Sequence, residues 1–152
     1  MSRAFVSEQA EDAKAAQLPE RPVSPAPNLV TARGLAQIEA HIAALQAELA
    51  AADDQARPRF QRDLRYWRAR QVSARLTPPP AQPGEVAFGT SVAIEHSGKR
   101  TTWRIVGEDE ADPARNLLAW TAPLAQALLG AEPGDTVEPG AGRPPVTVIA
   151  VE

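Results

Sequence analysis

Apolar residues recur at helical spacing through the first half of the chain. Between residues 31 and 51 they lie three or four positions apart, which places them on one face of an α-helix. A looser repeat of the same kind follows between residues 57 and 76. The first face consists of Leu35, Ile38, Ile42, Leu45 and Leu49, and the second consists of Phe60, Leu64, Trp67, Val72 and Leu76. The short connection between the two segments predicts an antiparallel helical hairpin.

The residues at the ends of these helices support the same interpretation. Thr31 precedes the first apolar repeat and is a suitable N-cap. Asp53 or Asp54 can cap the second helix, and Pro58 fits its first turn. The run that begins at Thr77 and continues through three prolines ends the second helix, which we expect to extend to Leu76.

The spacing of apolar residues changes to a period of two in the second half, which is typical of strands. Val92 and Ile94 alternate with polar or small residues, and residues 96–99 read as a hairpin turn. Further strands are expected at 102–106, 117–120, 136–137 and 146–151, with a short helix at 123–129. The fold class is therefore predicted as α+β: an antiparallel helical hairpin (coiled coil) followed by a small antiparallel β-sheet domain with one short helix.

These elements divide the chain into four segments. Residues 1–28 are expected to be a disordered or extended tail, because acids among alanines are followed by four prolines. Residues 29–77 form the hairpin, residues 78–84 a proline-rich linker, and residues 85–152 the C-terminal domain.

The charge is distributed unevenly along the chain. Residues 31–76 hold eight arginines and five acids, whereas residues 77–152 hold ten acids and five basic residues. Arginines on the second helix could line an acidic or phosphate-rich channel, or could simply form a solvated helix face. The candidates for a channel-facing role are Arg57, Arg59, Arg62 and Arg65. The overall net charge of −3 argues against a general nucleic-acid binder.

The amino-acid composition limits the kinds of metal site, disulfide and membrane segment that the chain can form. The chain has no cysteine and two histidines, which excludes a disulfide framework and a thiolate metal site and disfavours a zinc site. No apolar run approaches the roughly 20 residues that span a membrane, and the N-terminus lacks the features of a signal peptide. We therefore expect a cytoplasmic protein that does not associate with a membrane.

The second half contains the string Gly107-Glu108-Asp109-Glu110-Ala111-Asp112, which by itself reads as a polar loop between strands. In its setting this string resembles the C-terminal domain of the GreA/GreB transcript-cleavage factors, and it is the most specific of several such matches. Residues 88–89, 122–130 and 134–135 match in order and spacing, and residues 30–35 resemble the start of the Gre coiled coil.

This resemblance implies an FKBP-like C-terminal domain that docks on bacterial RNA polymerase at its secondary channel, while the coiled coil enters the channel. Thr121, Ala122, Pro123 and Leu124 occupy the position at which Gre factors contact the polymerase, although they also read as a helix N-terminus that packs on the sheet. Such a factor has no active site or cofactor of its own. It shares Mg²⁺ with the polymerase, meets nucleic acid only within the polymerase complex, and is expected to be a monomer.

The chain departs from the family pattern at the hairpin tip. The acidic motif of Gre factors is missing and the hairpin is short. Asp53 and Asp54 could replace the missing Mg²⁺ ligands, or they could belong to a capped and solvated turn. We therefore expect a factor that regulates transcription or occupies the channel, with active transcript cleavage through Asp53 and Asp54 as the alternative.

Two further classes are weaker alternatives. An FKBP-like prolyl isomerase needs an aromatic pocket, and the second half offers only Phe88, Trp103 and Trp120 as aromatic residues. A direct nucleic-acid binder that uses the arginine-rich helix would show affinity that falls steeply with salt, and the acidic second half argues against it.

Overall fold

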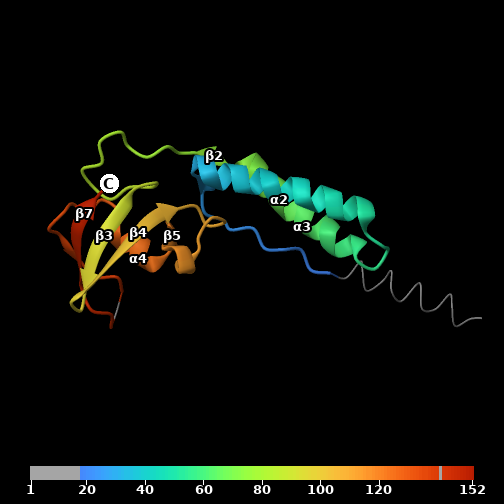
Figure 1. Cartoon of the computed structure of the whole chain (residues 1–152). Coiled ribbons are helices and arrows are strands. Elements are labelled where there is room, and N and C mark those ends of the chain that lie inside the picture. Colours follow the sequence, from blue (N-terminus) through green and yellow to red (C-terminus); the bar gives the residue numbers. More distant parts are fainter. Residues whose placement is uncertain (1–17, 141) are drawn as a thin grey trace, which may run out of the picture. The chain divides into compact units, whose positions relative to one another are not determined.

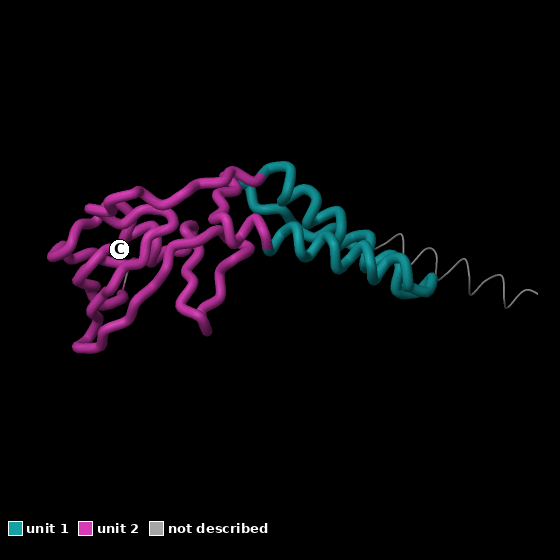
Figure 2. The backbone as a smooth tube through the Cα atoms, turned by 45° about the horizontal axis from the view of Figure 1, so that its top comes forward, with its two compact units in different colours: residues 1–25, 37–73 teal, residues 26–36, 74–152 magenta. Residues whose placement is uncertain are grey.

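A computed structural model describes residues 18–140 and 142–152 (Figure 1). Residues 1–17 lie outside the described residues, so the structure does not test the expected disordered tail there. The described chain forms two compact units (Figure 2). Unit 1 contains residues 18–25 and 37–73, and unit 2 contains residues 26–36 and 74–152. The chain therefore leaves unit 2, builds most of the hairpin, and returns to unit 2. The four-segment division predicted from the sequence stays a prediction.

Two helices form the hairpin, as the sequence predicts. Helix α2 (Ala32–Ala51) and helix α3 (Arg57–Ser73) lie side by side in both views (Figures 1 and 2). Ile38, Ile42 and Leu64 are buried between them. The rings of His41 and Trp67 stack across the pair with centroids 4.1 Å apart. Apolar burial and this ring contact hold the two helices together.

Helix α3 ends three residues before its predicted end. Strand β2 (Arg75–Leu76) follows it and pairs in parallel with strand β1 (Leu29–Val30). The N–H of Arg75 donates to the carbonyl of Asn28 at 2.8 Å, and the N–H of Thr77 donates to the carbonyl of Val30 at 2.9 Å. These bonds replace the helical ones, so the prediction that α3 extends to Leu76 is wrong.

The C-terminal domain is built on a five-stranded sheet. Its strands are β3 (Ser91–His96), β4 (Lys99–Val106), β5 (Leu117–Ala119), β6 (Thr136–Val137) and β7 (Val146–Val151), in the order β5-β4-β3-β7-β6. Three of the four pairings are antiparallel, and β5 pairs with β4 in parallel. The α+β class is confirmed. The prediction of an antiparallel sheet is wrong for one pair, because β5 returns parallel to β4 after a connection that contains a 3-10 helix (Pro113–Arg115).

The predicted β3–β4 hairpin turn is confirmed. His96 pairs with Lys99, which leaves Ser97 and Gly98 as a two-residue loop. Both loop residues have positive φ angles, 51° and 76°. This conformation suits the right-handed twist of the two strands and favours glycine at the second position.

Helix α4 (Pro123–Leu128) completes the domain core. Ala125 and Leu128 on α4 are fully buried, as are Val92, Ile105 and Val148 on the sheet. Trp103 and Trp120 are half-buried and pack against this cluster. In the described part of the chain, no helix combines the length and the apolar character needed to cross a membrane.

Candidate functional site

The hairpin tip places Asp53 and Asp54 in an exposed turn. The Asp53 Oδ1 atom accepts a hydrogen bond from the N–H of Ala56 at 2.8 Å, and the Asp53 carbonyl accepts one from the N–H of Arg57 at 3.0 Å. Asp53 therefore caps the start of α3. Asp54 lies next to it and is exposed. Among the described residues, no group of three or more carboxylate or imidazole side chains could hold a metal ion.

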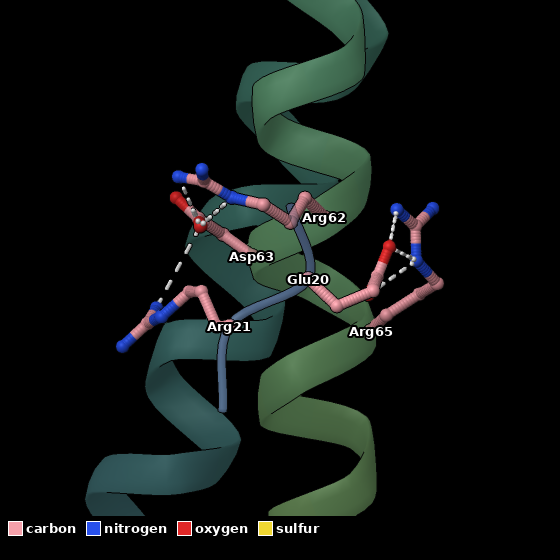
Figure 3. Close-up of polar contacts among 5 residues, drawn as sticks. All are labelled: Glu20, Arg21, Arg62, Asp63 and Arg65. Atoms are coloured by element: carbon pink, nitrogen blue, oxygen red, sulfur yellow. Dashed lines mark hydrogen bonds and ion pairs between the residues drawn. The ribbon is translucent and has the colours of Figure 1, made fainter. Parts of the chain in front are cut away.

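The candidate channel-facing arginines lie along α3 in different surroundings. Arg57 and Arg59 are exposed near the tip, and the guanidinium of Arg59 lies 5.1 Å from the ring centroid of Phe60. Arg62 is half-buried and contacts Asp63, with Nη2 and Oδ1 3.2 Å apart. Arg65 contacts Glu20, which comes from the segment before the hairpin (Figure 3). Two of the four arginines are thus paired with acids in this structure.

The contact between Glu20 and Arg65 is a forked ion pair. Arg65 Nε lies 3.1 Å from both carboxylate oxygens of Glu20, and Nη2 lies 2.5 Å from Oε1 (Figure 3). The hydrogen bonds from Arg65 hold the pKa of Glu20 below its ordinary value, and the hydrogen bond to Glu20 raises the pKa of Arg65. Since the folded-state pKa of Glu20 is depressed, the pair is fully formed above the ordinary carboxyl pKa and weakens as the pH falls below it.

Arg21 forms the second contact of this segment with α3. Its Nη1 atom lies 3.7 Å from Asp63 Oδ1 (Figure 3). Its guanidinium also lies over the ring of Tyr66, 4.0 Å from the centroid, and 5.7 Å from that of Trp67. The described part of the predicted tail, residues 18–25, is therefore an extended segment that contacts α3 through Glu20 and Arg21.

The predicted polymerase-binding residues form the approach to helix α4. Thr121 and Ala122 are half-buried, Ala122 is the N-cap residue, and Pro123 is exposed at the first helical position. Leu124 packs against the domain core. Gln126 holds the same segment, because its Nε2 atom donates to the Trp120 carbonyl at 2.6 Å. The segment is held by this hydrogen bond and by the packing of Leu124, and Pro123 is its exposed apolar residue.

Leu124 also lines a pocket of about 260 Å³ in the C-terminal domain. The pocket is mainly apolar, with basic side chains among its lining residues. The apolar lining includes Ile94, Trp103, Leu124, Pro139, Pro144 and Val146, and the basic lining residues are His96, Lys99 and Arg143. A pocket of this composition suits an apolar side chain that is accompanied by negative charge.

Glu110 has a role that the sequence did not reveal. Its side chain is only 3% exposed, and it accepts a hydrogen bond from the Thr31 hydroxyl. Arg33 Nη1 lies 3.7 Å from its Oε2 atom. The Thr31 Oγ1 atom accepts in turn from the N–H of Gly34 at 3.0 Å, which makes Thr31 the N-cap of α2. A Cβ at Gly34 would lie 2.8 Å from Glu110 Oε1, so glycine leaves room for the carboxylate.

These contacts join residues that are far apart in the chain. Thr31 and Glu110 are separated by 79 positions, and no local spacing in the sequence indicates that they meet. The only available signal was that both lie in strings that resemble one family. The contact fixes the first turn of α2 on the loop that follows β4, and both partners belong to unit 2.

A Thr31→Val substitution is expected to destabilise the chain by roughly 2 kcal/mol, because it removes the N-cap and leaves a buried carboxylate without its donor. The free energy of unfolding in urea measures this. Thr31→Ser should retain most of the stability, and Thr102→Val, at an exposed position on β4, should change it little. Equal losses for the serine and valine variants would contradict the role of the hydroxyl.

Comparison with known proteins identifies a family whose model matches the C-terminal domain. Residues 81–152 match the family model described as "Transcription elongation factor, GreA/GreB, C-term". A transcription elongation factor GreA from Verminephrobacter eiseniae is 49% identical over 57 residues, which are 36% of this chain and 36% of that protein. GreA from Paracoccus denitrificans is 41% identical over 75 residues, 46% of this chain and 48% of that protein. The match therefore spans half or less of these curated relatives.

Solved structures of low identity also align with the chain. The GreA factor homolog Gfh1 of Thermus thermophilus aligns with a TM-score of 0.41 and 17% identity, over 84% of this chain and 99% of that one. A GreA/GreB elongation factor from Nitrosomonas europaea aligns with a TM-score of 0.40 and 21% identity, over 82% and 98%.

Proposed function

The chain belongs to the GreA/GreB transcription elongation factor family, and from this premise we propose that it binds bacterial RNA polymerase at the secondary channel. The observation that carries the proposal is the match of residues 81–152 to the GreA/GreB C-terminal domain. The protein then acts in the cytoplasm as a monomer and works on the polymerase, with no active site or cofactor of its own.

The C-terminal domain docks through residues 121–124. Two features support this assignment. Pro123 is exposed at the start of α4, where a partner can reach it. Leu124 lines the apolar pocket, which can take a side chain from the docked partner. Docking at a helix start that is already formed, beside an existing pocket, requires little rearrangement of the domain.

The hairpin enters the channel with its arginine-rich helix. Helix α2 has 20 residues and is therefore about 30 Å long. Exposed Arg57 and Arg59 near the tip favour an acidic or phosphate-rich wall. Nucleic acid is met there only within the polymerase complex.

The residues of the hairpin tip suit a factor that occupies the channel better than one that stimulates transcript cleavage. A Mg²⁺ ion needs carboxylates that converge on it. Asp53 already uses one carboxylate oxygen to cap α3, which leaves Asp54 as the one uncommitted acid in this turn. We therefore propose a regulator that occupies the channel. Transcript cleavage with Mg²⁺ held by Asp53 and Asp54 is the alternative.

A backtracked elongation complex tests this function. We expect the protein to compete with an authentic GreA factor for the complex and to cause no more than a few per cent of the transcript shortening that GreA causes. An Asp53→Ala/Asp54→Ala double variant loses the Asp53 cap of α3, at a cost of about 1 kcal/mol in hairpin stability. It should still compete about as well as the parent chain, within about twofold, because the proposed docking residues 121–124 are unchanged. The length of the labelled transcript and the displacement of labelled GreA are measured.

Two outcomes would change the assignment. Transcript shortening by the parent chain that the double variant loses would establish the acids as metal ligands and favour the cleavage alternative. Absence of both shortening and competition would contradict polymerase binding altogether. A Glu48→Ala variant, which removes an exposed acid from α2 outside the tip, is the matched control.

A further inference from the structure

Residues 18–25, called the arm below, contact a surface of α3 with mixed charge. Helix α3 holds six arginines and one acid, Asp63. The arm brings one acid and one base to this helix, and each meets the opposite charge: Glu20 on Arg65 and Arg21 on Asp63 (Figure 3). The guanidinium of Arg21 also covers the Tyr66 ring. We call the surface formed by Asp63, Arg65, Tyr66 and Trp67 the arm-binding face.

The arm is held by contacts that are easily reversed. The Glu20 and Arg65 side chains are 62% and 56% exposed, and Arg21 is 37% exposed. Ion pairs with this exposure contribute little net free energy and are screened by salt. Pro19, Pro22 and Pro25 restrict the arm to extended conformations, so that little chain entropy is lost when it lies on α3. Such an arm can be displaced by a competitor that makes the same contacts.

We propose that the arm-binding face is a docking surface for a segment of a partner protein in which an acid is followed by a base, and that Glu20 and Arg21 mimic this segment and mask the face. The forked contact of Glu20 with Arg65 shows the chemistry that the face selects, a carboxylate on a planar guanidinium. The identity of the partner as RNA polymerase rests on the proposed function, whereas the chemistry of the face does not.

The charge pattern of the face favours a protein segment over a nucleic acid. Asp63 lies two positions from Arg65, and its Oδ1 atom is 3.7 Å from Arg21 Nη1. A continuous polyanion would place negative charge against this carboxylate, which is unfavourable. A peptide that carries an acid followed by a base satisfies both Arg65 and Asp63, as the arm does.

Masking is tested first in the free, full-length chain. The indole N–H signal of Trp67 in a nitrogen-15 spectrum, assigned with a Trp67→Phe variant, reports on the face. Glu20→Arg is expected to shift this signal and to leave those of Trp103 and Trp120 unchanged. Adding Arg65→Glu to that variant should restore the signal by reversing both charges. Glu39→Arg, the same change at an exposed position on α2, should shift nothing.

Binding is then tested with two defined probes on the Glu20→Arg chain. A synthetic peptide with the sequence of residues 18–25 should return the Trp67 signal toward its parent position. A single-stranded oligonucleotide of equal length should not. An unshifted Trp67 signal in Glu20→Arg, or a stronger response to the oligonucleotide than to the peptide, would overturn the proposal.

A measurement of polymerase affinity tests the masking role of the arm separately from the proposed function. Release of the arm should make Glu20→Arg bind core RNA polymerase about three- to fivefold more tightly than Glu39→Arg, the range of one exposed ion pair. Equal affinity of the two variants would overturn the masking role. A parent chain with no affinity for the polymerase would contradict the proposed function but not the arm-binding face. In that case the response of the Trp67 signal to the peptide would show whether the face binds such a segment.

Discussion

A Gly107→Ala chain is expected to lose roughly 3 kcal/mol of stability, because the new Cβ has no space. It would lie 2.4 Å from the carbonyl oxygen of Leu29 and 3.7 Å from the Cα of Val30. Both neighbours are backbone atoms of strand β1, which pairs with β2. A backbone atom cannot turn away as a flexible side chain can, so β1 or the end of β4 must move. Unfolding in urea measures the loss.

A second glycine provides the control for this experiment. Gly84 has nothing within 4 Å of an added Cβ, and its φ angle is not in the left-handed region. Gly84→Ala should therefore leave stability within about 0.5 kcal/mol of the parent or raise it slightly, since alanine has less freedom than glycine in the unfolded chain. If both alanine variants unfolded at the same urea concentration, the close approach of Leu29 to Gly107 would be refuted.

An Ile38→Ala chain is expected to lose about 3 kcal/mol, mostly from the hairpin. Ile38 is 1% exposed, and it is one of three buried apolar side chains on α2 and α3 beyond the hairpin base, with Ile42 and Leu64. A hairpin with so small a core has little to replace the lost contact. The helical circular dichroism signal should fall at lower urea than in the parent, together with the fluorescence change of Trp67 as its stack on His41 separates.

Val72 provides the comparison, since the sequence pattern ranks it with the buried face of α3. The side chain is 87% exposed, so Val72→Ala should cost less than about 0.5 kcal/mol. A loss at Val72 that approached the loss at Ile38 would mean that the helical spacing in the sequence describes the packing better than this structure does.

The sequence predicted the hairpin well where local chemistry decides the structure. Thr31 caps α2, and the helix ends at Ala51 because the turn residues follow. The prediction failed at the end of α3, where apolar residues continue at helical spacing but the backbone hydrogen bonds go to another segment. Leu76 sits at helical spacing in the sequence, yet the backbone at Arg75 and Thr77 bonds to residues 28 and 30. Periodicity cannot show that a distant segment supplies competing hydrogen-bond acceptors.

The candidate site shows the same division. The turn at Asp53 and the exposed start of α4 at Pro123 follow from local residue types, and both were named from the sequence. The pairing of Glu20 with Arg65 spans 45 positions, and that of Thr31 with Glu110 spans 79. The sequence showed Glu20 only as one acid in a proline-rich tail. Long-range pairing of this kind depends on the folded path of the chain, which composition and spacing do not encode.

The two-residue ladder between β1 and β2 has a consequence for how this protein can vary. It joins Leu29 to Arg75 and Val30 to Leu76, so both ends of the helical segment are fastened at one place. The segment between them is topologically an insert in the C-terminal fold. Closing a longer or shorter insert changes the entropic cost only slowly with length. Whole helical turns can therefore be added or removed at the tip while the C-terminal fold stays intact, so the length of the insert can change independently of the docking proposed for residues 121–124.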